Sequence, residues 1–81
     1  GRRIFIVHYP HYARAMAATG DYDLVCCGHT HHANVEMQAN LAGRETPIVN
    51  PGTIAGLGAA PTYAMVDLST LKCEIVPTSA D

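Results

Sequence analysis

The sequence predicts an α/β fold in which a strand–helix–strand unit is followed by antiparallel hairpins. Two continuous apolar runs of four residues lie on either side of a segment that carries helix start and stop signals. Farther along the chain, apolar and polar residues alternate with a period of two, which is typical of a half-buried strand. The remaining apolar runs are short and are separated by turns that contain Gly and Pro.

The first half of the chain predicts the strand–helix–strand unit. The apolar run Ile4–Val7 predicts a strand that is buried on both faces. Pro10 suits the first turn of a helix and Gly20 suits its C-terminal stop, so a helix is expected between them. Leu24–Cys27 is the second apolar run. A strand, a helix and a strand in such a short segment form a βαβ unit, so the two strands are expected to be parallel.

The second half of the chain predicts two hairpins. Val35–Leu41 alternates between apolar and polar residues, and after a turn the chain returns through Thr46–Val49. Pro47 lacks an N–H donor, so the returning strand is expected at the sheet edge or with the proline at its start. Beyond a Gly-rich loop, residues 63–68 and 71–76 predict a closing hairpin.

The composition limits the class of protein. At 81 residues the chain is one domain at most. It contains 15% charged and 48% hydrophobic residues, whereas soluble domains usually carry roughly 25% charged residues. One face is therefore expected to be covered by further sequence or by another chain, and the alternative is an ordinary small domain rich in Ala and Gly. A net charge of −2 with scattered cations argues against a nucleic-acid surface.

Cellular location is suggested by the cysteines and by the lack of targeting signals. No stretch predicts a signal peptide or a membrane span. The three cysteines have no CxxC spacing and are expected to be buried free thiols, which favours the cytoplasm. The cysteines, the methionines and Tyr63 are expected in the core. The chain begins at Gly1 without a methionine, which indicates an expression scar, a proteolytic product or an excerpt of a longer protein.

The five histidines are concentrated after the two strands that should be parallel. Those after the first strand are His8 and His11, and those after the second are His29, His31 and His32. The carboxyl ends of parallel strands meet at one edge of a sheet, where ligand sites lie. His8 and His29 are therefore expected to meet at this edge. The strand that ends before Asn50 runs back towards the same edge, so the segment 50–52 should also arrive there.

The loop after the second strand has a pattern that favours metal binding. Residues two apart in an extended chain point the same way, so His29 and His31 are expected to face one small volume. Gly28 should allow the backbone to turn sharply before them, and Thr30 should serve only to space them. Neutral imidazole is a common ligand of first-row metals. Together with His8, three nitrogens could bind Zn²⁺ weakly and leave an open coordination position.

These motifs resemble those of a known family. His8, the loop Gly28-His29-Thr30-His31, the sequence Asn50-Pro51-Gly52-Thr53 and a closing hairpin resemble the C-terminal half of the calcineurin-like metallophosphoesterases. The similarity is greatest to their small bacterial and archaeal phosphodiesterase branch, where the later motif ends in Ser instead of Thr. The resemblance implies that residues 1–81 are the C-terminal part of a four-layer α/β/β/α sandwich domain, preceded by a segment that carries further metal-binding motifs.

The resemblance also implies an activity. Members hydrolyse phosphoester bonds, as phosphodiesterases or phosphatases, with a water activated by two divalent metal ions. His8 and His29 match ligands of one ion and His31 matches a ligand of the other, and the ions would be Mn, Fe, Ni or Zn. The expected substrate is a small phosphoester, with a nucleotide-type compound as one option.

Four further residues are candidates for the substrate pocket. By the resemblance, Asn50, Gly52 and Thr53 would shape the pocket wall. His11 lies at the predicted helix start, where it is expected to be a surface residue that could face the substrate. Tyr9 stands where relatives often have Gly, which changes the expected width of the pocket.

The departures from the family pattern limit what the chain can do alone. The family's other ligands lie in Asp-x-His, Gly-Asp and Gly-Asn-His-Asp motifs, and no aspartate of this chain is placed to take those roles. Asp21 and Asp23 fall at the opposite edge of the predicted sheet, and Asp67 lies in the closing hairpin. The isolated chain is therefore expected to be inactive.

The sequence is also compatible with two other functions. One is a non-catalytic protein-binding scaffold of the same fold, similar to the retromer scaffold subunit. The other is a zinc-binding module made by this chain alone. The presence of His8, His29 and His31 together favours the enzyme, because a scaffold has no need of three candidate ligands.

Overall fold

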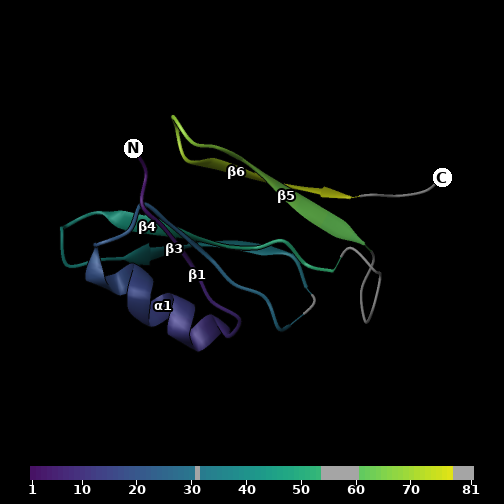
Figure 1. Ribbon diagram of the computed structural model, residues 1–81, viewed down its shortest axis with the longest axis horizontal. Coiled ribbons are helices and arrows are strands. Elements are labelled where there is room, and N and C mark those ends of the chain that lie inside the picture. Colours follow the sequence, from purple (N-terminus) through teal and green to yellow (C-terminus); the bar gives the residue numbers. More distant parts are fainter. Residues whose placement is uncertain (31, 54–60, 78–81) are drawn as a thin grey trace.

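The computed structural model describes residues 1–30, 32–53 and 61–77, and its elements follow the predicted order (Figure 1). The elements are β1 (Ile4–Ile6), α1 (Pro10–Thr19), β2 (Leu24–Cys26), β3 (Asn34–Ala39), β4 (Glu45–Asn50), β5 (Thr62–Asp67) and β6 (Lys72–Pro77). The strands form a four-stranded sheet in the order β1-β2-β4-β3 and a two-stranded sheet of β5 and β6. The predicted α/β fold class is confirmed.

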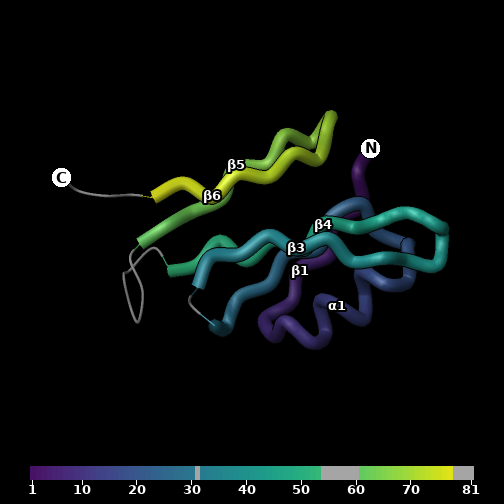
Figure 2. Tube along the Cα trace, turned by 180° about the vertical axis from the view of Figure 1, so that it is seen from behind, coloured from purple at the N-terminus to yellow at the C-terminus, as the bar shows by residue number. Residues whose placement is uncertain are grey.

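The four-stranded sheet is mixed. β1 pairs with β2 in parallel, with Ile4 opposite Leu24, and β2 pairs with β4 in parallel. β3 and β4 form an antiparallel hairpin. Helix α1 covers one face of this sheet, and the β5–β6 hairpin lies on the other side, as both views of the chain show (Figures 1 and 2). The predicted parallel pairing of the two apolar runs is confirmed.

Helix α1 is fixed to the sheet by its alanines. Pro10 is in the first turn, and Gly20 ends the helix in the left-handed conformation with φ 79°, its N–H bonded to the carbonyl of Ala17. Ala13 and Ala17 are fully buried, and their small side chains bring the helix close to the sheet. They form the core with Val25, Cys27 and Ile48. Within the described parts of the chain, no helix has the length and apolar character needed to cross a membrane.

The prediction that the first strand is buried on both faces is wrong. β1 is an edge strand, and its Ile4 and Ile6 side chains are 42% and 78% exposed, whereas Phe5 packs against the core under α1. Three predicted core residues, Met37, Met65 and Tyr63, are also 40% exposed or more. An apolar run indicates that a strand favours apolar contacts, but whether another element covers the strand depends on the rest of the fold.

Of the two alternatives predicted for the strand of Pro47, the sheet edge is wrong, because β4 lies between β2 and β3, and Pro47 lies instead near the start of the strand. The carbonyl of Val49 accepts from the N–H of Cys27, so the backbone groups of Val49 and, two residues earlier, of Pro47 face β2. The β2–β4 ladder begins with Val25 opposite Ile48. The N–H that Pro47 lacks would point towards β2, just before this ladder begins. Its absence therefore removes no hydrogen bond between β4 and β3.

Candidate metal centre

Two histidine rings meet at the carboxyl ends of β1 and β2. The Nε2 of His8 and the Nδ1 of His29 are 3.3 Å apart, and the rings are inclined at 77° with centroids 5.1 Å apart. Both side chains are exposed. At this separation the N–H of one ring can donate to the lone pair of the other, and the tautomers decide which ring donates. The sequence-based expectation that these two imidazoles gather at one sheet edge is met.

The backbone holds this contact by extending the parallel pairing beyond the strands. The Val7 N–H donates to the carbonyl of Cys26 at 3.0 Å, and the Gly28 N–H donates to the carbonyl of His8 at 2.9 Å. Backbone hydrogen bonds alone therefore join the two segments that carry the imidazoles.

The sharp turn that was predicted at Gly28 occurs at His29 instead. His29 has φ 74°, while Gly28 is not among the residues of positive φ. This conformation costs a residue with a Cβ about 1–2 kcal/mol, although His adopts it more readily than most. The Thr30 N–H closes the turn on the carbonyl of Gly28 at 2.9 Å. The prediction that His29 and His31 face one small volume required an extended backbone, and His29 is not extended. His31 itself lies outside the described residues.

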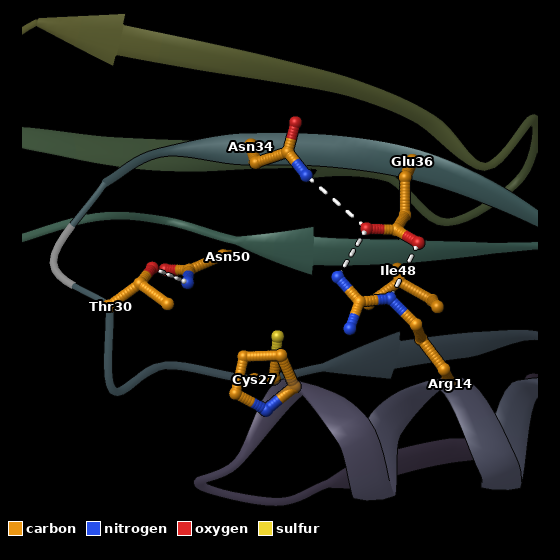
Figure 3. Close-up of a pocket in the computed structure, with 8 residues that line it drawn as sticks. Arg14, Cys27, Thr30, Asn34, Glu36, Ile48 and Asn50 are labelled. Atoms are coloured by element: carbon orange, nitrogen blue, oxygen red, sulfur yellow. Dashed lines mark hydrogen bonds and ion pairs between the residues drawn. The ribbon is translucent and has the colours of Figure 1, made fainter.

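Asn50 fastens this turn to the end of β4 (Figure 3). Its side chain is buried, and its Nδ2 donates to the carbonyl of Gly28 at 3.1 Å and to the Thr30 hydroxyl at 2.9 Å. Its Oδ1 accepts from the N–H of Gly52 at 3.0 Å. Thr30, expected only to space two ligands, is thus an anchor of the turn. The predicted return of this segment to the histidine edge is confirmed.

Gly52 and Thr53 pack against the start of β5. Gly52 has φ 84°, which a residue with a Cβ rarely adopts. The carbonyl of Thr53 accepts from the Thr62 N–H at 2.9 Å, and the Thr62 hydroxyl donates to the carbonyl of Pro51 at 2.8 Å. Thr53 is 8% exposed. Their predicted role in a substrate pocket remains a prediction, and their observed contacts join the β5–β6 hairpin to the histidine edge.

A group of aromatic rings continues from the histidine pair to the start of α1. The centroid of the Tyr9 ring is 4.7 Å from those of both His8 and His29. His11 follows, with its ring centroid 5.7 Å from Tyr9 and 4.4 Å from Tyr12. Sequence reasoning noted Tyr9 only as a departure from relatives and missed this contact. The position of Tyr9 directly after His8, a candidate ligand at a strand end, could have indicated this contact.

The carboxylates of Asp23 and Asp67 are engaged away from the histidine pair. Asp23 accepts from the Arg3 N–H at 2.8 Å and pairs with Arg2 at 3.7 Å, at the other end of β1. Asp67 accepts from Ser69 in the β5–β6 turn. The helix α1 begins beside the histidine pair and has no acidic residue in its first turn, so its N-terminal partial charge favours an anion there.

A cavity of about 70 Å³ lies behind the turn, between α1 and β3 (Figure 3). The Glu36 carboxylate in it accepts from Arg14 at 3.0 and 3.3 Å and from Asn34 at 3.4 Å. The hydrogen bond to Glu36 raises the pKa of Arg14. Because the two charges satisfy each other, this cavity has no free charge to attract a ligand. A wider hollow of about 450 Å³ lies beside His8 and is also lined by Ile6, Cys26 and Pro51.

The three cysteines are free, as predicted. Burial is the main cause that raises the pKa of the thiol in each, namely Cys26, Cys27 and Cys73. Cys27 is buried, whereas Cys26 and Cys73 are partly buried. They remain protonated near neutral pH and behave as small apolar side chains.

The two imidazoles fit one divalent cation. Zinc–nitrogen bonds of about 2.0–2.1 Å drawn from nitrogens 3.3 Å apart meet at about 105–110°, close to the tetrahedral angle. The described residues do not complete a centre, because no group of three or more His, Cys, Asp or Glu side chains gathers among them. The pair is therefore a suitable but partial set of ligands.

Comparison with known proteins shows the family of the chain. The model of the calcineurin-like phosphoesterase superfamily domain matches residues 1–71, which include His8, the loop after β2 and the segment 50–53. No curated protein and no solved structure gives a significant match. Because the matched range spans most of the 81 residues, the chain belongs to the calcineurin-like phosphoesterase superfamily.

Proposed function

We propose that His8 and His29 are ligands of a divalent metal ion in a phosphoester-hydrolysing site, with His31 as a ligand of a second ion. The observation that carries the proposal is the 3.3 Å separation of the Nε2 of His8 and the Nδ1 of His29. Membership of a phosphoesterase family makes a metal the natural occupant of the space between two facing nitrogens.

The residues around the pair would present a phosphoester to it. When bound, divalent ions supply Lewis acidity that polarises a phosphoryl oxygen and activates water. The exposed rings of His8 and His29 leave the approach open, and the start of α1 favours the negative charge of a phosphate. Asn50 would keep the turn of His29 in place, and Gly52, Thr53 and His11 would border the substrate.

The remaining ligands are proposed to come from elsewhere. The described residues bring two imidazoles and no carboxylate to this edge, so oxygen ligands would be supplied by sequence outside the 81 residues or by another chain. The 81-residue chain alone is therefore expected to bind a metal ion without hydrolysing a phosphodiester above the background rate.

The proposal is tested by calorimetric titration of the 81-residue chain with Zn²⁺ and with Mn²⁺. The wild-type chain should bind with one-to-one stoichiometry, and His8→Ala and His29→Ala should each weaken binding by at least about tenfold, since each removes a coordinating nitrogen. His11→Ala is the matched control, because this histidine lies at the same edge but contacts Tyr9 and Tyr12 instead of the pair.

Each outcome of this titration decides between functions. Equal affinity in the wild-type chain and in both ligand variants would overturn the assignment and leave the scaffold alternative. Loss of affinity in His11→Ala as well would show unspecific binding by exposed imidazoles. Circular dichroism of each variant checks that the fold is retained.

A further inference from the structure

Tyr9, His11 and Tyr12 form an exposed aromatic surface beside the histidine pair, called here the aromatic shelf. Tyr9 is 43% exposed and Tyr12 is 55% exposed. The Tyr9 ring centroid lies 4.7 Å from that of His29, and the Tyr12 ring centroid lies 6.3 Å from that of Tyr9. The shelf therefore starts in contact with the candidate ligands and extends one further ring away from them.

The shelf is not explained by packing of the core. The α1 residues that pack on the sheet are Ala13 and Ala17, which are fully buried. Tyr22 shows the contrast, because its ring packs on Phe5 at 5.1 Å and under the guanidinium of Arg3 at 5.7 Å. The rings of Tyr9 and Tyr12 are inclined at 63° to each other, and each half-exposed ring beside the candidate metal site instead offers its own apolar face to a ligand.

We infer that the aromatic shelf binds a planar aromatic group carried by the phosphoester whose phosphorus lies at the histidine pair. This inference rests on the proposed function, because the histidine pair fixes where the phosphate would be. A group attached to that phosphate and directed along the start of α1 would pass over Tyr9 first and then over Tyr12. Stacking on such rings tolerates many planar groups, because each has a π-face.

Two kinds of substrate carry such a ring, and they differ in reach. In an aryl phosphate the ring follows the ester oxygen directly, so it would lie on Tyr9. In a nucleotide a ribose separates the base from the phosphate, so the base would reach Tyr12. Tyr9 is thus expected to bind the ring of an aryl phosphate, and Tyr12 is expected to bind the base of a nucleotide.

The test compares ligands with and without a ring. The 81-residue chain loaded with Zn²⁺ is titrated with phenyl phosphate, AMP, ribose 5-phosphate and inorganic phosphate. The two compounds that carry rings should bind about tenfold more tightly than the other two, a factor within the range of base–aromatic stacking. Tyr9→Leu should abolish the advantage of phenyl phosphate, and Tyr12→Leu should abolish that of AMP.

Control variants separate the role of the ring from a loss of structure. Tyr9→Phe and Tyr12→Phe keep the ring and should keep the affinity. Tyr63→Leu replaces a tyrosine of similar exposure on β5 and should leave all four affinities unchanged. If ring-carrying and ring-free ligands bind equally to the wild-type chain, the shelf has no such role.

A metal-free arm distinguishes failure of the shelf from failure of the metal site. Adenosine, with ribose as its control, should shift the ring proton resonances of Tyr9 or Tyr12 without any metal. If adenosine shifts them while Zn²⁺ fails to bind, the proposed metal site is wrong and the stacking surface stands. If Zn²⁺ binds but no ring ligand gains affinity and no resonance moves, the shelf is wrong and the metal site stands.

Discussion

The two ends of β4 each depend on an asparagine, but the two asparagines act over different lengths of chain. Before β4, the Oδ1 of Asn40 accepts from the N–H groups of Ala42 and Arg44, and its Nδ2 donates to the Thr46 hydroxyl. These partners are two to six residues away. At the other end, the Oδ1 of Asn50 accepts from nearby Gly52, but its Nδ2 donates to groups 20 and 22 residues away, in the turn that carries His29.

This difference separates a folding element from a site element. The contacts of Asn40 make a turn that any hairpin requires, and they would form in the isolated hairpin. The contacts of Asn50 exist only when β4 has docked beside β2, and they set the position of a candidate ligand. Variants at the two ends of β4 should therefore differ in their effect on metal binding more than in their effect on stability.

The largest difference is expected between the glycines at the two ends. Gly43 and Gly52 have φ 80° and 84°, so an alanine in either place costs about 1–2 kcal/mol of backbone strain. At Gly43 a Cβ would meet nothing within 4 Å, whereas at Gly52 it would collide with the Thr62 hydroxyl and lie 3.1 Å from the Ala33 nitrogen. Such crowding adds about 1–3 kcal/mol.

Urea unfolding measures this difference. Gly52→Ala should lower the free energy of unfolding by about 2–5 kcal/mol, and Gly43→Ala should lower it by about 1–2 kcal/mol. Equal losses in the two variants would show that the segment around residue 52 yields easily and that the two ends of β4 are alike.

The second difference concerns the asparagines themselves. Asn50→Ala removes a buried amide that donates to the Gly28 carbonyl and the Thr30 hydroxyl and accepts from the Gly52 N–H, so the free energy of unfolding should fall by about 2–3 kcal/mol. Asn40 is partly buried in an otherwise exposed turn, so Asn40→Ala should cost about 1–2 kcal/mol. Metal affinity, measured by calorimetry at a temperature where both variants are folded, should fall about 10–100-fold for Asn50→Ala only.

A structural role alone would give a different pattern. If Asn40→Ala and Asn50→Ala weaken metal binding equally, the effect follows stability and Asn50 does not position His29. Asn50→Asp supplies a further check, because it keeps the acceptor for Gly52 but loses the donor to Gly28 and Thr30. It should therefore resemble Asn50→Ala in metal affinity.

The smallest effect is expected at a third turn, between β5 and β6. The Asp67 carboxylate accepts from the Ser69 hydroxyl at 2.7 Å and from its N–H at 2.9 Å, and the first of these bonds is the main cause that lowers the pKa of Asp67. A lowered pKa stabilises the folded chain above the unfolded value of about 3.9, and this contribution is lost as the pH falls through the folded pKa.

Substitution of the hydroxyl donor isolates this effect. In Ser69→Ala the pKa of Asp67 should rise but stay below its usual value, because the backbone N–H still donates. An NMR titration of the carboxyl carbon measures the change directly. An unchanged titration midpoint would show that the Ser69 hydroxyl does not lower the pKa of Asp67. Metal affinity should be the same in the wild-type chain and in Ser69→Ala.

The order of the elements and the contact between two candidate ligands followed from local signals. Apolar runs, the start of α1 at Pro10 and its stop at Gly20 are properties of neighbouring residues, and each predicted its element correctly. The meeting of His8 and His29 followed because parallel pairing leaves the ends of two strands no other arrangement.

The features that escaped prediction depend on distant partners. The exposure of Ile6 depends on whether anything covers β1, and the central position of Pro47 depends on which side of β4 meets β2. The left-handed conformation of His29 depends on bonds that close the turn, including those from Asn50. No pattern within a few residues contains this information.

The open edge of β1 lies close to the candidate metal centre. Within the described residues β1 pairs only with β2, so its outer backbone groups can accept another extended segment. β1 ends two residues before His8, whose ring contacts that of His29. A strand added there would bring its own side chains next to the imidazoles, so closing the sheet and completing the ligand set would be one event instead of two.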